Sequence, residues 1–424
     1  MNADRASAAD TSGVALRAYP PPCLAAFTIC SDLDETPHEH DAYFEIARYL
    51  NTRQETAMGP GVGLEIGNSI YFDMPTNQFA YRTTDDRGRE RIRTLIRSGH
   101  IDVLHSYGDF ASTRAHCAAA IDELNKHDCK LRVWVDHSKA PSNFGPDIMC
   151  GRGDLPGEDV YHADLTRAYG VRFIWRGRTT GVNGQDVPIG PRAISHLWDP
   201  RHPLASAKVA AKECVKLHLG RRPHPRWEMY TANRVLREST FRDGAPTWEF
   251  LRSNPYWGGS GLGDTAGGIA QVLTSRMLDR LVQTRGVCVL YTHLGKCDDP
   301  RRPFPAASCE AFERLAARAR DGRLFVTTTS RLLQYLAVRD TLRYRVIREP
   351  QATRIVIDSI GEPGGVRRMP TDTELQGITF ELPSGGGRVI VERSTGGELQ
   401  TRITEADGKR LVAIPWQRLQ FPDL

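Results

Sequence analysis

Short apolar runs alternate with helical patterns along most of the chain, from about residue 23 to residue 341. Several runs are almost continuously apolar, which is typical of strands buried on both faces of a parallel sheet. The segments between them repeat apolar residues at the period of an amphipathic helix. This alternation predicts an α/β fold in which roughly seven or eight strand–helix units close into a barrel. The expected strands are LAAFTICS (24–31), GVGLEIG (61–67), IDVLHSY (101–107), LRVWVD (131–136), VRFIW (171–175), GVCVLYTH (286–293) and RLFVTTT (323–329).

Three segments depart from this rhythm. Residues 1–22 are polar and end in consecutive prolines, so we expect a flexible N-terminal arm. Around residues 176–230 glycine, proline and arginine are frequent, which indicates an insertion or long loops within a barrel that spans 23–341. Residues 342–424 contain alternating strand-like segments separated by glycine and proline, which predicts a small C-terminal antiparallel β domain.

Composition and charge narrow the function classes. The 424 residues are 40% hydrophobic and 25% charged, as expected of a globular protein. The net charge is only +5 and the basic residues are scattered, so no nucleic-acid partner is expected. Nine cysteines without a C-x-x-C pair are typical of reduced thiols. The N-terminus has no apolar signal-peptide core and no run reaches the roughly 18 apolar residues of a membrane span, so we expect a cytoplasmic protein.

Polar side chains follow four of the predicted strands at their C-terminal ends, where parallel barrels carry their functional groups. They are Asp32 and Asp34 after the first run, His105 and Asp109 after the third, His137 after the fourth, and His293 at the end of the penultimate run. Taken singly, Asp34 and Asp109 are equally suited to capping the helices that follow them. Taken together, the residues predict one site at one mouth of the barrel.

The residue types favour a divalent metal. Asp32 and Asp34 are two residues apart, so on an extended segment their side chains lie on the same side. His105 and Asp109 have the i, i+4 spacing that brings two ligands together if the segment is helical. Carboxylate and imidazole donors with open coordination positions suit Zn²⁺ acting as a Lewis acid. The pattern therefore predicts a metal site in which one aspartate is a ligand and the other a base.

FTICSDLDE followed by GHIDVLHSYGDF resembles the first two motifs of the polysaccharide deacetylases, the NodB-homology domain of carbohydrate esterase family 4. In that family an Asp-x-Asp pair ends the first strand. The resemblance implies that Asp32 is the general base and that Asp34 binds the metal. The second motif, H-[ST]-x-x-H, matches His105 and Ser106, with Asp109 where a second His is usual. Asp34, His105 and Asp109 are thus the implied ligands of a divalent metal, with Zn²⁺ favoured.

Later segments resemble the remaining motifs more loosely. VCVLYTHLG is similar to the final motif and implies that His293 is the general acid. The family's R-x-P motif is absent after the fourth strand, where VWVDHSKAPSNFG stands, so His137 is expected as a third nitrogen ligand or a substrate contact. TFRDGAPTW (240–248) stands where the family has an Asp and a Trp, which implies Arg242 and Trp248 as substrate contacts.

The resemblance covers about residues 23–340 and implies a metal-dependent deacetylase. Its expected substrate is an N-acetyl group on a sugar, a sugar nucleotide or an intracellular glycan precursor. Tyr107 is expected to contact the substrate, with a nearby backbone N–H holding the oxyanion of the reaction. Two alternative functions stay open, namely a glycoside hydrolase on a related barrel and a carbohydrate-binding protein without turnover. The oligomeric state is open as well.

Overall fold

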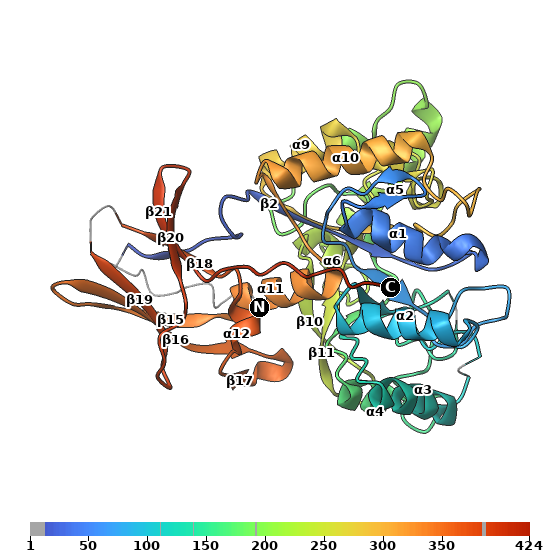
Figure 1. Cartoon of the computed structure of the whole chain (residues 1–424), viewed down its shortest axis with the longest axis horizontal. Helices are drawn as coiled ribbons and strands as arrows, with labels where there is room; N and C mark the ends of the chain where they lie inside the picture. The colour runs from blue at the N-terminus through green and yellow to red at the C-terminus, as the bar shows by residue number, and fades with distance from the viewer. Residues whose placement is uncertain (1–12, 111, 139, 191–192, 384–386) are drawn as a thin grey trace. The chain divides into compact units, whose positions relative to one another are not determined.

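The computed structural model describes residues 13–110, 112–138, 140–190, 193–383 and 387–424 (Figure 1). The chain forms two compact units. The large unit comprises residues 25–332 and 419–424, and the described part of the small unit comprises residues 13–24, 333–383 and 387–418. The predicted boundary at residue 342 therefore falls late, because most of helix α11 (Thr329–Thr341) belongs to the small unit. Within these ranges no helix is long and apolar enough to cross a membrane.

The first sheet of the large unit is built around β2 (Ala25–Ser31), whose seven residues are all buried. Two strands, β13 (Val287–Thr292) and β14 (Leu324–Val326), pair with β2 in parallel, one on each side. The full order is β14-β2-β13-β12-β9, with β9 at Thr179–Thr180 and β12 at Arg252–Ser253. The continuous apolar run of β2 is thus explained by burial on both faces.

The second sheet has the order β10-β11-β8-β7-β6-β5 and is parallel except for the β10–β11 pair. Its strands are β5 (Asn68–Ile70), β6 (Ile101–Leu104), β7 (Val133–Val135), β8 (Phe173–Trp175), β10 (Leu236–Thr240) and β11 (Pro246–Phe250). The prediction of a mixed α/β fold with parallel sheets is confirmed. The hydrogen bonds between the described strands form two open sheets, not one closed barrel.

Helices connect these strands. Helices α2, α3 and α9 each begin after a residue whose side chain accepts a backbone N–H of the first turn, namely Asp85, Thr113 and Thr274. Helices α3 and α4 lie side by side, as do α9 and α10 (Figure 1). The bounds are α1 (Ala42–Asn51), α2 (Asp86–Arg97), α3 (Arg114–Lys126), α4 (Ala163–Tyr169), α5 (Pro203–Leu219), α6 (Glu228–Ala232), α7 (Ser260–Gly263), α8 (Ile269–Val272), α9 (Ser275–Thr284) and α10 (Ala306–Arg320). A short hairpin of β3 (Glu55–Thr56) and β4 (Gly59–Pro60) follows α1.

The run GVGLEIG (61–67) is not a strand, contrary to the prediction. The Gly63 N–H donates to the Thr52 carbonyl at 2.8 Å, which ties this run back to the end of α1. Gly63 also has a φ of +62°, which glycine adopts without the steric cost of a side chain. The strand that follows this run is β5, which begins at Asn68.

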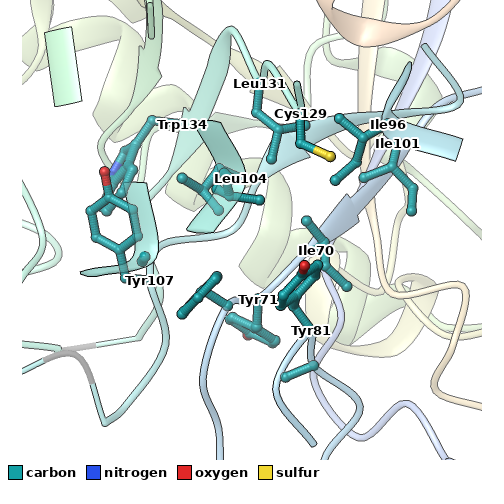
Figure 2. Close-up of a cluster of buried hydrophobic side chains, with 14 of the residues drawn as sticks. Ile70, Tyr71, Tyr81, Ile96, Ile101, Leu104, Tyr107, Cys129, Leu131 and Trp134 are labelled. Atoms are coloured by element: carbon teal, nitrogen blue, oxygen red, sulfur yellow. The ribbon is translucent and has the colours of Figure 1, made fainter. Parts of the chain in front are cut away.

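A hydrophobic core packs β5, β6 and β7 against α1, α2 and α3. Figure 2 shows part of this core, in which Tyr107 lies against Trp134 with ring centroids 5.1 Å apart. Burying a large apolar side chain is worth roughly 1.5–3 kcal/mol. The core therefore holds these strands firmly in register, and with them the residues at their C-terminal ends.

The segment 176–230, predicted as an insertion or long loops, contains β9 and α5 and ends inside α6. Helix α5 begins with Pro203, a residue favoured in the first helical turn. Along α5 only Ser206 and Glu213 are buried. Since so few of its residues pack inward, α5 has no regular apolar stripe, and this explains why the hydrophobic pattern does not predict it.

The small unit contains two sheets, one fully antiparallel with the order β1-β18-β21-β20. In the other, β15 and β17 pair antiparallel with β16 while β19 pairs parallel to it. The predicted antiparallel domain is therefore mixed, because the chain between β16 and β19 passes through α12 and β18, a crossover long enough for parallel pairing. The bounds are β1 (Ala15–Leu16), β15 (Arg343–Arg348), β16 (Ala352–Gly361), β17 (Arg367–Arg368), α12 (Asp372–Leu375), β18 (Thr379–Leu382), β19 (Arg388–Arg393), β20 (Arg402–Ala406) and β21 (Lys409–Ala413).

Both ends of the chain differ from the prediction. Residues 13–22 are not a loose arm, because β1 pairs with β18 and the buried Arg17 side chain lies 2.9 Å from Asp407. The rest of the predicted arm, residues 1–12, lies outside the described residues. At the other end, residues 419–424 belong to the large unit, where the Leu419 N–H donates to the Glu65 carboxylate at 2.8 Å.

Candidate active site

A cavity of about 730 Å³ lies at the C-terminal ends of the parallel strands in the large unit. Its floor carries carboxylates and imidazoles from four strand ends, as the sequence predicts. These residues are Asp32 and Asp34 after β2, His105 after β6, His137 after β7, and His293 after β13. We refer to these five residues as the floor cluster.

Asp32 is buried and forms a two-pronged ion pair with Arg252. The Arg252 guanidinium donates to both carboxylate oxygens, at 2.6 and 2.9 Å. Burial raises the pKa of Asp32, but the charge and the hydrogen bonds of Arg252 outweigh burial, so this pKa lies below its ordinary value. Asp32 is therefore ionised at neutral pH.

Arg252 is itself fully buried and held between two aromatic rings. Its guanidinium carbon lies 3.5 Å from the Trp175 ring centroid and 4.4 Å from that of Tyr291. Cation–π contacts of this kind partly replace the hydration that a buried cation loses. Arg252 is thus held in place, and it fixes the orientation of Asp32 in turn.

Asp34 lies at the centre of the floor cluster. His137 Nε2 is 2.8 Å from one of its oxygens and His293 Nε2 is 3.0 Å from the other. The Tyr71 hydroxyl, from the hydrophobic core beneath, also donates to Asp34 at 3.1 Å. Burial raises the pKa of Asp34, but the hydrogen bonds from the two imidazoles outweigh burial and bring this pKa well below its ordinary range.

His105 supplies a buried imidazole between the two aspartates. Its ring stacks on Tyr71 with centroids 4.4 Å apart, and its Nε2 lies 3.7 Å from an Asp32 oxygen. Burial lowers the pKa of His105 to about 4, so the ring is neutral at pH 7. A neutral imidazole is the form that coordinates a metal.

The donor set is suited to a divalent cation. One ligand atom each of Asp32, Asp34 and His105 lies within 4.8 Å of the others. Two carboxylates and a neutral imidazole are ligands that Zn²⁺ accepts. These three residues could therefore hold a metal.

His293 lies between two carboxylates, Asp34 and Asp264. Its Nδ1 lies 3.1 Å from an Asp264 carboxylate oxygen. Burial lowers the pKa of His293, but the contacts with Asp264 and Asp34 outweigh burial and raise this pKa to about 9. His293 is therefore protonated at neutral pH, with its Nε2 proton directed at Asp34.

Asp109, predicted as a metal ligand, is separated from Asp34 by the His137 ring. Its carboxylate lies 3.0 Å from His137 Nδ1, so it reaches Asp34 only through that ring. The expected helical turn after β6 is wrong, because Ser106 and Gly108 have φ values of +58° and +96°. This tight turn separates Asp109 from His105.

Three other predicted residues do not line the cavity. Tyr107 is buried in the hydrophobic core and its hydroxyl bonds the Thr166 hydroxyl at 2.8 Å. Arg242 donates to the buried carboxylate of Asp154, at 2.9 Å from its Nε. Trp248 is buried within β11. The structure does not place these three side chains in the cavity, because packing in the core and an internal ion pair already use them.

No family model matches the chain, and no curated protein matches it in sequence. The chemistry of the site therefore rests on the contacts described above.

Sequence reasoning misses Arg252 and Asp264, which form ion pairs with Asp32 and His293 of the floor cluster. Arg252 interrupts the apolar run WEFLRSN (248–254), and a charge inside a run that predicts a buried strand is the available signal. Asp264 lies in the glycine-rich segment GGSGLGDTAGG (258–268), whose pattern indicates a loop. No spacing links either residue to its partner, since both contacts join distant parts of the chain.

Proposed function

We propose that the large unit is a metal-dependent hydrolase that removes an N-acetyl group from a sugar and releases acetate. The observation that carries the proposal is the convergence of Asp32, Asp34 and His105 on the floor of one cavity. We propose further that the two parallel sheets belong to a barrel of the deacetylase type. The Ser69 hydroxyl of β5 donates to the Ser31 carbonyl of β2 at 2.5 Å, which supports this reading.

Asp34 and His105 would hold the divalent metal, and Asp32, whose carboxylate oxygens both accept hydrogen bonds from Arg252, would lie beside it as the base. When bound there, such a cation supplies Lewis-acid chemistry, since it polarises an amide carbonyl and lowers the pKa of water. Zn²⁺ is the metal that this donor set favours.

The residues around the donor set divide the proton transfers between them. Asp32, ionised and held by Arg252, accepts a proton from the attacking water as the new C–O bond forms. His293, protonated and held by Asp264, gives its proton to the amide nitrogen as the C–N bond breaks. The products are acetate and the free amine, and both residues return to their starting states by exchanging the proton with solvent.

The electrostatics favour amide hydrolysis over glycoside hydrolysis. A glycosidase needs one carboxylic acid that stays protonated to donate to the leaving oxygen. Asp32 and Asp34 both have lowered pKa values, so neither suits that role. Burial raises the pKa of Asp136, which also lines the cavity, to about 7, but its two oxygens already accept hydrogen bonds from Trp134 and from the Phe144 and Gly145 N–H groups. The proton donor of the floor cluster is an imidazole, which suits a departing amine.

The test is acetate release by the purified protein from N-acetylglucosamine, its β-1,4 oligomers and N-acetylated sugar nucleotides. Acetate should appear, stop on treatment with 1,10-phenanthroline and return on adding Zn²⁺. The Asp34→Asn variant should be inactive unless Zn²⁺ is present in large excess. The matched control Asp279→Asn, which removes a carboxylate paired with Arg318 outside the cavity, should be as active as the wild type.

New reducing ends without acetate would favour the glycoside hydrolase instead. Tight sugar binding with neither product, in protein loaded with Zn²⁺, would favour the carbohydrate-binding alternative.

A further inference from the structure

One wall of the cavity is built by α5 and α6 and carries basic and aromatic side chains. Val209, Lys212, Glu213 and Lys216 line the cavity from one face of α5, at the spacing of successive helical turns. Arg226, Trp227 and Tyr230 line it from the start of α6. We call these seven residues the α5–α6 wall.

Two of the cations that line the cavity are neutralised by carboxylates. Lys216 lies 2.6 Å from Glu213 and also donates to the Thr179 carbonyl at 2.7 Å. Lys296, across the cavity, lies 2.6 Å from Glu35. These pairs leave no net charge for a ligand.

Lys212 and Arg226 are different. Among the described residues, neither forms an ion pair, and the Arg226 Nε is buried without a hydrogen-bond partner. The Arg226 guanidinium lies 4.7 Å from the Trp227 ring centroid. A positive charge held over an aromatic ring beside a cavity, with its donors unused, is the arrangement that binds phosphate.

We propose that Lys212 and Arg226 bind a phosphate ester carried by the substrate, while its acetamido group lies at the floor cluster. This inference rests on the proposed function and names its substrate class, a phosphorylated N-acetyl sugar. The cavity of about 730 Å³ is in the range that encloses a whole drug-sized ligand, so it has room for a sugar and its phosphate together. Trp227 and Tyr230 offer apolar faces on which a sugar or a base can pack.

The phosphate could belong to a nucleotide-activated sugar or to a lipid-linked one, and the wall recognises the group that they share. Binding experiments on the full chain separate the two. Dissociation constants are measured for N-acetylglucosamine, N-acetylglucosamine 1-phosphate, UDP-N-acetylglucosamine, and N-acetylglucosaminyl diphosphoprenol in detergent micelles.

The wild type should bind the 1-phosphate about 10–100-fold more tightly than the neutral sugar, as expected for hydrogen bonds to a charged group. Lys212→Gln and Arg226→Gln should each remove most of this preference without changing the affinity for the neutral sugar. Because Lys212 is exposed, its variant keeps the fold. The matched control is Lys208→Gln, on the same helix but outside the cavity lining, and it should keep the full preference.

Whichever of the nucleotide and prenol compounds binds more tightly than the 1-phosphate identifies the source of the phosphate. The proposal is wrong if the wild type binds neutral and phosphorylated sugar equally, or if both wall variants keep the preference. Acetate release from neutral oligomers with no phosphate preference would leave the hydrolase standing and overturn this inference. A phosphate preference without acetate release would leave this inference standing and overturn the hydrolase.

Discussion

Two buried carboxylates of the large unit, Asp32 and Glu249, are each bound to arginine, and only Asp32 borders the cavity. Asp32 of the floor cluster binds Arg252 and faces the cavity. Glu249, on β11, binds Arg176, Arg178 and Arg237 at 2.7, 2.6 and 2.7 Å, and none of these four residues lines the cavity. We call the second group the arginine cluster.

Electrostatics alone does not tell these clusters apart. Burial raises the pKa of Glu249, but the three guanidinium groups outweigh it and lower this pKa to about 2. The pKa of Asp32 is also lowered by a buried arginine. The two clusters differ in their other partners. The floor cluster includes imidazoles and opens to a cavity, while the partners of Glu249 are arginines, which stay charged. A perturbed pKa marks a functional site only together with access and transferable protons.

The largest effect is expected for Asp32→Asn. If Asp32 takes the proton from water, turnover should fall by about 10²–10⁴-fold in acetate-release assays. Stability should fall too, by about 3–5 kcal/mol in urea unfolding, because Arg252 then carries a buried charge without a partner. The double variant Asp32→Asn/Arg252→Met should regain most of the stability but none of the activity. Near-normal turnover in either variant would remove Asp32 from the mechanism.

Glu249→Gln should act on stability alone. Loss of a buried partner from three arginines should cost about 3–5 kcal/mol of unfolding free energy at pH 7, while acetate release per folded molecule stays unchanged. Because the pKa of Glu249 is about 2 when folded and 4.5 when unfolded, its stabilisation is present above pH 4.5 and is lost as pH falls toward 2. The gap between wild type and variant should therefore narrow below pH 4.5. A gap that widens on acidification would show that the three arginines do not lower this pKa.

A smaller effect is expected for Tyr107→Phe, which distinguishes a role in packing the core from the predicted contact with substrate. The change removes one buried hydrogen bond to Thr166 and should cost about 1 kcal/mol. Acetate release should be unaffected, because Tyr107 lies in the core and not in the cavity lining. A fall in turnover larger than the fall in folded fraction would return Tyr107 to the site.

The strand ends could be predicted from sequence, whereas the contacts between them could not. Continuous apolar runs ending in polar residues correctly predict that Asp32, Asp34, His105, His137 and His293 lie together, because such runs form buried parallel strands. The helical turn expected at Asp109 fails because two residues with positive φ turn the chain more tightly.

The charged partners Arg252 and Asp264 lie on or beside elements that are too short to show a hydrophobic period in the sequence. Arg252 lies on a strand of two residues, and Asp264 directly follows the short helix α7. Helix α5, which carries Lys212, is exposed on most of its surface and has no apolar stripe. Periodicity predicts elements that bury a face, so the wall of the cavity is less predictable than its floor.

The most direct test of the account is a zinc titration of metal-free protein, followed by acetate release from the best substrate of the panel. In the wild type, activity should rise with Zn²⁺ and saturate at one equivalent per chain. In Asp34→Asn the rise should need a large excess of Zn²⁺, because a charged ligand is missing. Undiminished acetate release from metal-free wild type, or identical titration curves for the two proteins, would contradict the assignment of Asp34 and His105 as the centre of a metal-dependent hydrolase.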